Sequence, residues 1–457
     1  MAANRRVVVT GLGVVSSIGS DPDRFWSNCL EGNSSVTPIP EHWWRYANYH
    51  SSIWATLDPI DRDEMGLTRV EVAQNDPASL IAGYAARQAL TNAGLQPELI
   101  NKRSNSYRLA GVDAHRIGVF MGTGIGGANS FLDNYTVQML GAQKAKLGEI
   151  LSTLPEDGEA REAADAVLES LQHGRRFNPF VVSMLMPNAI SAHIGLKYSI
   201  NGPNLSYCVA CASGTAAIGH AFRAVRDGTV DFAISGGSEY LDDYYGGIFH
   251  GFDIARALVR DCDDMHAANR PFDVNRSGFL YSQGGAAVLM LEDLDTAMGR
   301  AAPILAEVAG YAETFDAYSV MSIAPDGVQI ERMMSAALLD AGMSHSDIQY
   351  INAHGTGTQA NDAIETDIIG RVFGREVLVN STKSLIGHTI GASGAIEALV
   401  TVMSLKEQRT HACINLDEPL TDLNFAREAT SIPMDAALTQ SFAFGGHNAG
   451  LVLKRFV

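Results

Sequence analysis

The 457-residue sequence has no uninterrupted apolar run of about 18 residues, the length that a membrane-spanning helix needs. The apolar stretch at residues 7–9 is short and is followed by no small-residue cleavage site, so we expect no secretory signal. Cysteines are few, odd in number and scattered, which argues against a disulfide framework and predicts a reducing, cytoplasmic location. They are Cys29, Cys208, Cys211, Cys262 and Cys413.

Basic residues are also scarce. The chain has 33 Lys and Arg against 51 Asp and Glu, which gives a formal net charge of −18. Because binding to phosphates needs a concentrated basic face, nucleic acid is not expected to be the main partner.

Strand-like and helix-like segments alternate along the chain, which predicts an α/β fold. The N-terminal region gives expected strands at residues 6–15, 116–121, 231–234 and 286–291, and a helix at 80–93. From about residue 303 the pattern begins again, with strands at 304–311, 348–352 and 376–380 and helices at 327–341, 362–373 and 392–406. We therefore expect two structurally similar halves, residues 1–302 and 303–457.

The most informative segment of the first half is residues 205–220, which predicts a strand turning sharply into a helix. Cys211 falls at the start of that helix, where unpaired backbone N–H groups and the positive end of the helix dipole favour a thiolate. The small residues that follow let the helix lie deep in the protein. This arrangement suits a buried nucleophile.

Other interpretations of this segment stay open. Cys208 and Cys211 form a C-x-x-C pattern, and a thioredoxin-like redox site also opens a helix. Zinc would require a second pair of ligands at a suitable spacing, and the sequence shows none. We expect Cys208 to be a packed strand residue, and Cys211 alone could be an inert core thiol.

The second half supplies possible partners for the thiol. His354 follows an apolar strand, so it is expected at the carboxyl end of that strand, where the sites of α/β proteins collect. Lys383 and His388 lie five residues apart in a glycine-containing loop. Residues 440–448 form a tight glycine turn that could aim a backbone N–H at a developing oxyanion.

Together these motifs resemble the elongating class of β-ketoacyl-acyl-carrier-protein synthases, condensing enzymes with a Cys-His-His site. The resemblance covers essentially the whole chain, and its motifs lie at residues 210–214, 270–273, 354–358, 383–388 and 444–446. It implies a thiolase-like fold in which two α/β halves form five αβαβα layers.

The resemblance also implies roles for single residues. Cys211 would carry the acyl group as a thioester, and His354 and His388 would bind the malonyl thioester and promote loss of carbon dioxide. Lys383 would organise this network through Glu365. The remaining implied positions are Phe444 and Phe442 at the oxyanion hole and gate, Thr356 and Thr358 at the pantetheine arm, Ile125 and Phe252 in the acyl pocket, and Arg256 in carrier docking.

An enzyme of this kind would hold no cofactor or metal of its own, because its substrates arrive on the phosphopantetheine of an acyl carrier protein. It would form a homodimer, or a heterodimer with a ketosynthase homologue. Carrier proteins are usually acidic, so docking would need a local basic patch on a chain of charge −18.

The sequence departs from the fatty-acid enzymes at His447, Ala443 and Gln283, and residues 68–74 lack the basic cluster that often docks the carrier. The run from His354 to Thr366 resembles polyketide-type ketosynthases, so we hypothesise a specialised synthase for a polyketide or polyene. A non-catalytic chain-length-factor-like partner is the alternative from another class. Such proteins characteristically lose the nucleophile, whereas this chain keeps Cys211.

Overall fold

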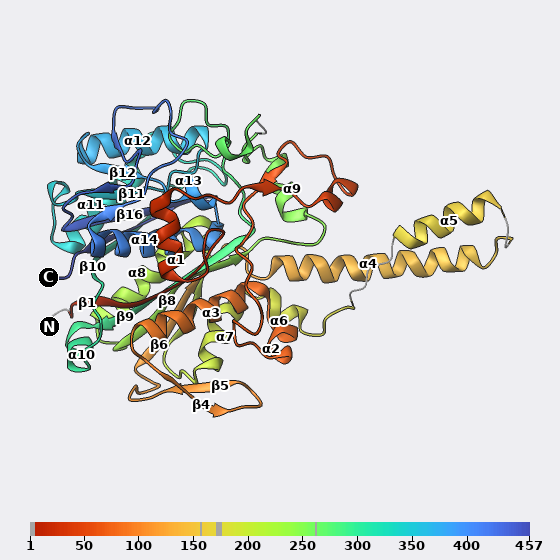
Figure 1. Ribbon diagram of the computed structural model, residues 1–457, viewed down its shortest axis with the longest axis horizontal. Helices are drawn as coiled ribbons and strands as arrows, with labels where there is room; N and C mark the ends of the chain where they lie inside the picture. The colour runs from red at the N-terminus through yellow and green to blue at the C-terminus, as the bar shows by residue number, and fades with distance from the viewer. Residues whose placement is uncertain (1–4, 156–157, 171–175, 261–262) are drawn as a thin grey trace.

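The computed structural model describes residues 5–155, 158–170, 176–260 and 263–457, so Cys262 lies outside the described residues. One mixed sheet of eleven strands runs through the molecule in the order β14-β12-β11-β16-β17-β10-β1-β9-β8-β6-β7. Figure 1 shows this sheet with helices on its faces and with both chain termini at the same side. No helix of the described ranges is apolar over a length sufficient to cross a bilayer.

The two halves of the sheet repeat one plan. The strands of the first half are β1 (Val7–Val15), β9 (Gly284–Asp293), β8 (Phe232–Tyr240), β6 (Ile117–Gly122) and β7 (Asn204–Tyr207). Those of the second are β10 (Ala306–Phe315), β17 (His447–Lys454), β16 (Ala436–Ala443), β11 (Tyr350–Asn352), β12 (Leu378–Asn380) and β14 (Asn424–Phe425). In the first half, two antiparallel pairings are followed by two parallel ones. In the second half, two antiparallel pairings are followed by three parallel ones. Short antiparallel pairing of β1 with β10 joins the halves.

Helices complete the layers. The central pair, α8 (Ser213–Arg226) and α14 (Ser393–Glu407), contacts strands of both halves, including β8 and β16. On the outer face of the first half lie α3 (Pro77–Asn92) and α7 (Ala189–Lys197), and on that of the second lies α11 (Val328–Ala341) with α12 (Gln359–Phe373) beside it. The predicted α/β fold of two similar halves in five layers is confirmed.

The two central helices begin in the same way. A 3₁₀ turn (Ala210–Ala212) precedes α8, and another (Ile390–Ala392) precedes α14. In both turns the first residue has a positive φ, 47° at Ala210 and 49° at Ile390. Glycines at 214 and 394 let the helix starts approach closely, because a Cβ on Gly214 would lie 2.7 Å from the backbone nitrogen of Ala395. The expected elements did not include this repeated turn.

A helical pair that the sequence pattern had not predicted extends from the body. It consists of α4 (Ala128–Leu151) and α5 (Glu159–Ser170), which Figure 1 shows extending beyond the other layers. We call these two helices the arm. It begins directly after β6, which is the neighbour of the sheet's edge strand β7.

Candidate active site

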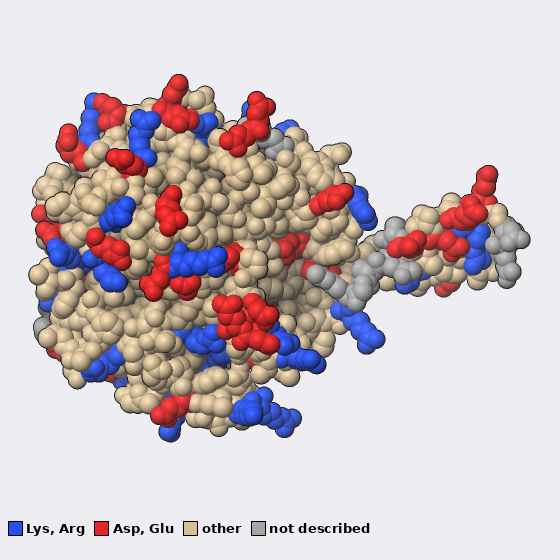
Figure 2. Space-filling model, viewed as in Figure 1, with Lys and Arg blue, Asp and Glu red and all other residues tan. Residues whose placement is uncertain are grey.

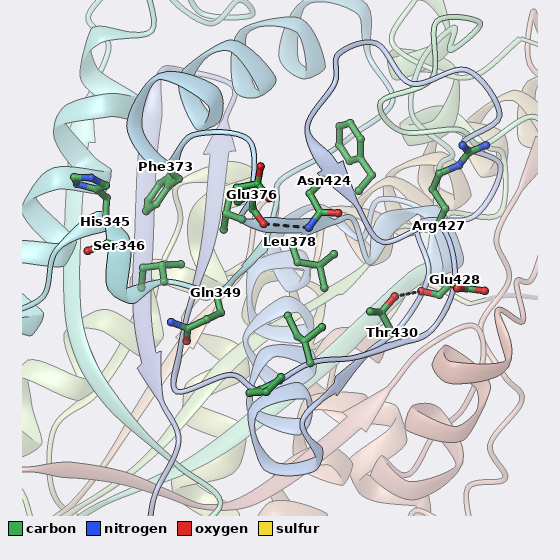
Figure 3. Close-up of a pocket in the computed structure, with 15 residues that line it drawn as sticks. His345, Ser346, Gln349, Phe373, Glu376, Leu378, Asn424, Arg427, Glu428 and Thr430 are labelled. Atoms are coloured by element: carbon green, nitrogen blue, oxygen red, sulfur yellow. Dashed lines mark hydrogen bonds between the residues drawn. The ribbon is translucent and has the colours of Figure 1, made fainter.

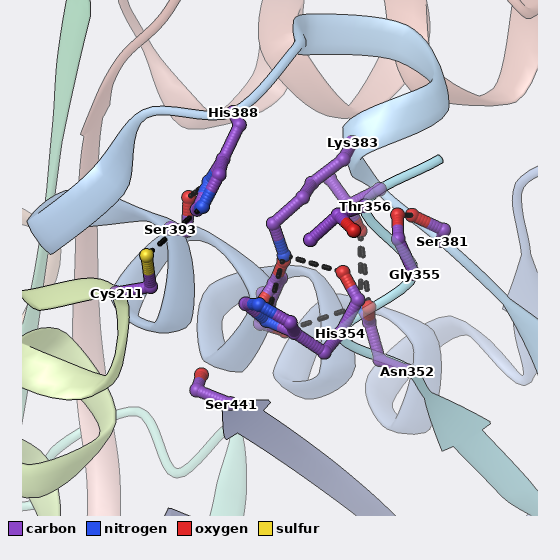
Figure 4. Close-up of polar contacts among 12 residues, drawn as sticks. Cys211, Asn352, His354, Gly355, Thr356, Ser381, Lys383, His388, Ser393 and Ser441 are labelled. Atoms are coloured by element: carbon purple, nitrogen blue, oxygen red, sulfur yellow. Dashed lines mark hydrogen bonds and ion pairs between the residues drawn. The ribbon is translucent and has the colours of Figure 1, made fainter. Parts of the chain in front are cut away.

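The buried thiol of Cys211 lies in the 3₁₀ turn ahead of α8, so the predicted position at a helix start is confirmed. Its sulfur lies 3.1 Å from Nε2 of His388. Figure 4 shows the cysteine and the histidine facing each other from the two halves of the chain.

The two histidines come from loops at the carboxyl ends of parallel strands. His354 follows β11 by two residues, as the sequence predicted, and His388 follows α13 (Lys383–Ile386), which itself follows β12. Their ring centroids lie 5.6 Å apart with an interplanar angle of 86°. Both side chains are buried, so the fold brings one thiol and two imidazoles into a single enclosed place.

Lys383 connects this group to the protein interior. Its ammonium donates to the backbone carbonyl of His354 at 2.6 Å, lies 3.2 Å from Nδ1 of the same histidine, and forms an ion pair with Glu397 of α14. Lysine and glutamate are both almost completely buried. The predicted connection of Lys383 through Glu365 is therefore wrong, because Glu397 is the carboxylate that it contacts.

Glu365 has a different task. Its carboxylate accepts hydrogen bonds from the backbone N–H groups of His354 at 2.7 Å and Gly355 at 2.8 Å, and from the side-chain amide of Gln440 at 2.8 Å. The residue thus fixes the loop that carries His354 without touching the reacting thiol. Burial raises the pKa of Glu365 to about 7.

Burial dominates the electrostatics of the thiol. It raises the pKa of Cys211 to about 12, although the charge of Lys383 and the backbone N–H groups of Phe444 and Cys211 act in the opposite direction. The expected thiolate at the helix start is therefore not the resting form. The helix end lowers the energy of a thiolate, but removal of the sulfur from water costs more.

Burial also keeps both imidazoles neutral. It lowers the pKa of His354 and of His388 well below the usual value, and the positive charge of Lys383 lowers both further. Because an ammonium can only donate, Nδ1 of His354 is the acceptor and Nε2 carries the proton. His354 therefore presents a neutral N–H donor.

The second histidine has a partner that can donate or accept. The hydroxyl oxygen of Ser393, at the start of α14, lies 2.9 Å from Nδ1 of His388 and accepts from the backbone N–H of Thr389 at 3.1 Å. A hydroxyl can serve either tautomer of an imidazole. Sequence reasoning missed Ser393, although the repeated Ala-Ser-Gly at 212–214 and 392–394 could have signalled it.

A cavity of about 110 Å³ opens onto this group. Cys211, His354, His388, Thr356 and Thr358 all line it, and the two threonine hydroxyl oxygens lie 2.9 Å apart. The positions expected at the pantetheine arm therefore lie in the same cavity as the thiol.

The two phenylalanines expected at the gate differ. Phe444 is 37% exposed and stands at the cavity wall, followed by a Gly445 whose N–H donates to Val320 at 2.7 Å. Phe442 is 2% exposed and packs edge-on against the ring of His354, with centroids 5.5 Å apart. This placement makes Phe442 a fixed support of His354 and argues against a gating role for it.

The expected acyl-pocket residues lie outside the lining of the small cavity. Ile125 and Phe252 pack, partly buried, against the hydrophobic core that contains Cys211. Arg256, the expected docking residue, is exposed with a φ of 59°. It precedes Ala257, whose carbonyl accepts from the N–H of Phe279, a residue of the cavity wall, at 3.0 Å.

Cys208 is exposed just beyond β7 rather than packed in a strand as predicted. Its sulfur donates to the carbonyl of Gly124 at 3.2 Å, whereas the sulfur of Cys211 faces His388. Both thiols are free. The two sulfurs have separate partners, which disfavours the redox alternative.

Two of the sequence departures have local structural reasons. Gln283 donates to Asp242 at 2.9 Å and accepts from the N–H of Leu57 at 2.9 Å, and a carboxylate at this position would face that of Asp242. Within residues 68–74, Glu71 forms a 2.8 Å ion pair with Lys197. The segment thus helps to hold α7 in place.

A larger cavity, of about 800 Å³, lies in the second half. Its lining includes Gln349 and Leu378, at the starts of β11 and β12 (Figure 3). His354 and Lys383, by contrast, follow the ends of these strands. This cavity therefore lies at the opposite end of the strands from Cys211, and its lining contains none of the predicted site residues.

Known proteins share this architecture over the whole chain. The profile of the β-ketoacyl synthase N-terminal domain matches residues 4–297, and that of the C-terminal domain matches residues 305–417. The 3-oxoacyl-acyl-carrier-protein synthase 2 of Synechocystis sp. is 34% identical over 99% of this chain and 98% of its own length. The enzyme of the same name from Staphylococcus aureus is also 34% identical, over the whole of both chains.

Solved structures agree. A β-ketoacyl synthase from Burkholderia phymatum has a TM-score of 0.80 and 28% identity over 99% of this chain and all of its own. The ishigamide ketosynthase/chain length factor has a TM-score of 0.78 and 27% identity over the whole of both chains. These matches show a thiolase-like fold, and the chain belongs to the β-ketoacyl synthase family of condensing acyltransferases.

Proposed function

We propose that this protein lengthens an acyl chain held on Cys211 by decarboxylative condensation with a malonyl group on an acyl carrier protein. One observation carries the proposal. A buried thiol lies 3.1 Å from Nε2 of His388, and the neutral ring of His354 stands at 5.6 Å from that of His388 in the same cavity.

In the loading step, Sγ of Cys211 attacks the carbonyl carbon of an incoming acyl thioester. The thiol is protonated at rest, so its proton must leave during attack, and Nε2 of His388 is the base within reach. Nδ1–H then donates to Ser393. The proton passes to the departing pantetheine thiol, and the acyl group remains on the sulfur as a thioester.

In the condensation step, the malonyl thioester loses carbon dioxide and leaves an enolate. The Nε2–H groups of His354 and His388 donate to the enolate oxygen, and Ser393 permits the tautomer of His388 that this requires. The enolate carbon attacks the acyl carbonyl, a C–C bond forms and the C–S bond to Cys211 breaks. The released sulfur takes up one proton.

The acyl carbonyl oxygen also becomes negative during this attack. The backbone N–H groups of Cys211 and Phe444 lower the pKa of the thiol, which indicates that both lie close to the sulfur. We assign them to the oxyanion hole. Donors that are already in position when charge develops stabilise it without reorganisation.

Lys383 and Glu397 act on this chemistry through His354. The ammonium holds Nδ1 as an acceptor, so Nε2 stays protonated, and the pair supplies a fixed positive charge near the enolate. Neither group needs to touch substrate. We therefore regard both as positioning residues.

We further propose that the substrates arrive on the phosphopantetheine of a carrier protein. One solved relative, 26% identical with a TM-score of 0.77, is a type II polyketide ketosynthase in complex with its acyl-carrier protein. Thr356 and Thr358 would contact the phosphopantetheine inside the cavity. Exposed Arg256 would meet the acidic carrier at the rim.

Self-association through β7 also belongs to the proposal. Among the residues that the structure describes, this strand ends the sheet and pairs only with β6, so its other edge presents unpaired backbone groups, with Leu205 exposed. A second copy related by a two-fold axis can pair with that edge in antiparallel fashion. The heterodimer with a ketosynthase homologue is the alternative assembly.

The pathway is proposed separately. The curated relatives are named 3-oxoacyl-acyl-carrier-protein synthase 2, which points to elongation of a carrier-bound acyl chain. The run from His354 to Thr366 supports the hypothesis of a polyketide or polyene substrate. The division of the chain at residues 302 and 303 likewise stays a proposal.

The test is intact-mass analysis of carrier protein after incubation with malonyl-carrier and acyl donors of graded length. We expect the purified protein to add two carbons and release carbon dioxide, and the donor lengths consumed identify the pathway. No product from any donor, with loading and decarboxylation also absent, would overturn the proposal.

A further inference from the structure

Glu239 is a buried carboxylate whose described hydrogen-bond partners are all neutral. Figure 2 shows Asp and Glu side chains spread over one face of the molecule, whereas Glu239, near the end of β8, is 0% exposed. Its partners are three backbone N–H groups and one hydroxyl. Burial raises the pKa of Glu239 to about 7. A buried carboxyl group without an opposite charge costs folding free energy, and such groups cluster at functional sites.

The donors come from both halves of the chain. Oε1 accepts from the hydroxyl of Thr123 at 2.9 Å and from the N–H of Ile125 at 3.3 Å. Oε2 accepts from the N–H of Gly124 at 2.5 Å and from that of Gly391 at 2.9 Å. The first three donors belong to the loop that follows β6, whereas Gly391 lies in the 3₁₀ turn that precedes α14. The carboxylate therefore joins the loop to the turn.

Glycine allows the loop and the turn to approach each other. A Cβ on Gly391 would lie 2.2 Å from the backbone nitrogen of Gly124 and 2.5 Å from Oε2 of Glu239. A Cβ on Gly124 would lie 2.8 Å from the same oxygen and 2.7 Å from Cγ2 of Ile390. A side chain at either glycine would push the two backbones apart. Their separation is thus small enough for both to share one carboxylate.

Both segments lie beside the reacting thiol. Ile390, in the turn, lines the cavity that contains Cys211. Ile125, in the loop, packs against the hydrophobic core that contains the same cysteine. Burial raises the pKa of the Cys211 thiol, and the charge of Glu239 raises it further, which indicates that the carboxylate lies close to the sulfur.

We infer that Glu239 is a positioning residue that sets the acyl-chain specificity of the enzyme, because it holds the loop of Ile125 against the turn of Ile390. The inference rests on the proposed function, which assigns Ile125 to the acyl pocket. The shape of a hydrophobic pocket decides how strongly an enzyme discriminates chains that differ by a few methylenes. A wall held by a fixed carboxylate keeps one shape, and a released wall accepts more lengths. Glu239 itself needs no contact with substrate.

Acyl loading from donors of graded length tests the inference on the full chain. The readout is the ratio of kcat/KM between the best acyl-carrier donor and the donor two carbons longer. A general loss of active protein lowers both values equally and leaves this ratio unchanged. In Glu239→Gln the amide NH₂ faces N–H donors of the backbone, so we expect the ratio to fall about fivefold or more. Glu239→Asp keeps the charge on a shorter side chain and should give an intermediate ratio.

Two further variants show whether the effect is specific. Glu292→Gln is the matched control, because Glu292 of neighbouring β9 is also completely buried and forms an ion pair with Arg300. This control should keep the wild-type ratio. Ile125→Ala alters the pocket wall directly. In that background Glu239→Gln should change the ratio little, because the two residues act through the same wall.

Denaturant unfolding establishes that each variant is folded, and the ratio in Glu239→Asp decides if Glu239→Gln is not. A folded Glu239 variant with the wild-type ratio, or additive effects of the Glu239 and Ile125 substitutions, would overturn the role of Glu239 and leave the proposed function intact. A wild type that loads donors of all lengths equally would do the same. A wild type that loads no donor would overturn both.

Discussion

Lys383 contributes both to the stability of the fold and to catalysis, and substitutions of this lysine allow the two contributions to be measured separately. In Lys383→Met, the carboxyl group of Glu397 stays buried and loses its ion-pair partner. Breaking one side of a buried pair costs about 3–5 kcal/mol. We therefore expect the free energy of unfolding to fall by about that amount at pH 8.

The loss should depend on pH in a defined direction. Burial already raises the pKa of Glu397 from 4.5 to about 7 with the lysine present, and removal of the lysine raises it further. A carboxyl group whose folded pKa is raised contributes its stability below the unfolded pKa and loses it as the pH rises toward the folded value. Lys383→Met should therefore be close to the wild type at pH 4.5 and fall behind it toward pH 8.

A second substitution isolates the charge. The double variant Lys383→Met/Glu397→Met contains neither charge, and replacement of a buried pair by apolar side chains is often neutral for stability. We expect its unfolding curve to return toward that of the wild type. Lys406→Met is the matched control, because Lys406 is exposed near the end of the same helix that carries Glu397.

Catalysis should not recover with stability. Both Lys383 variants lack the donor that holds Nδ1 of His354, and loss of one electrostatic contact of this kind costs about 10²- to 10³-fold in kcat. The assays are denaturant unfolding across pH and release of carbon dioxide from malonyl-carrier. Wild-type stability of Lys383→Met at pH 8, or restored decarboxylation in the double variant, would refute the reasoning.

Four further substitutions, besides one control, probe the same site and its surroundings. His354→Ala should slow malonyl decarboxylation about 10²-fold or more while acyl loading is nearly preserved. His388→Ala should impair both steps, because His388 is the histidine whose ring nitrogen contacts the sulfur of Cys211. Equal losses of the two steps in His354→Ala would contradict this division. Ser393→Ala removes the hydroxyl that serves both tautomers of His388, so we expect about tenfold lower kcat with an altered pH–rate profile. Ser384→Ala removes a buried hydroxyl near the same loop and should leave that profile unchanged. Burial raises the pKa of Asp76 from 3.8 to about 6, so this carboxyl group destabilises the fold increasingly as the pH rises between these two values. Asp76→Asn should therefore gain up to about 3 kcal/mol in unfolding free energy relative to the wild type between pH 4 and 7. Parallel stability curves for the two proteins would exclude this effect.

Much of the fold follows from local pattern. The helix expected at residues 327–341 is observed as Val328–Ala341, because Gly327 and Gly342 take left-handed conformations that bound it. The strands around residues 286–291 and 348–352 are apolar runs that a buried sheet requires. The arm was not predicted, since the long helix α4 has only a weak apolar period and carries no motif.

The site shows where sequence reasoning reaches its limit. Cys211, His354 and His388 are marked by glycine-rich turns after strands, so their positions were predictable. Glu397 lies within an apolar helix, and only the folded chain brings it to Lys383. The assignment of Glu365 instead relied on nearness in sequence to His354.

The protonation of the thiol could not be predicted either. The position of Cys211 at a helix start is a local property, and by itself it favours the thiolate. The degree of burial depends on residues from both halves of the chain, and burial decides the pKa. The exposure of Cys208 is likewise a consequence of β7 being the last strand of the sheet.

Mapping of the acylated residue tests the central claim most directly. The protein is incubated with an acyl-carrier donor in the absence of malonyl-carrier, digested, and analysed by peptide mass spectrometry. We predict that the acyl mass appears on the peptide containing Cys211, persists in Cys208→Ser and disappears in Cys211→Ala. Acylation that remains in Cys211→Ala, or that is found on Cys208, would contradict the account.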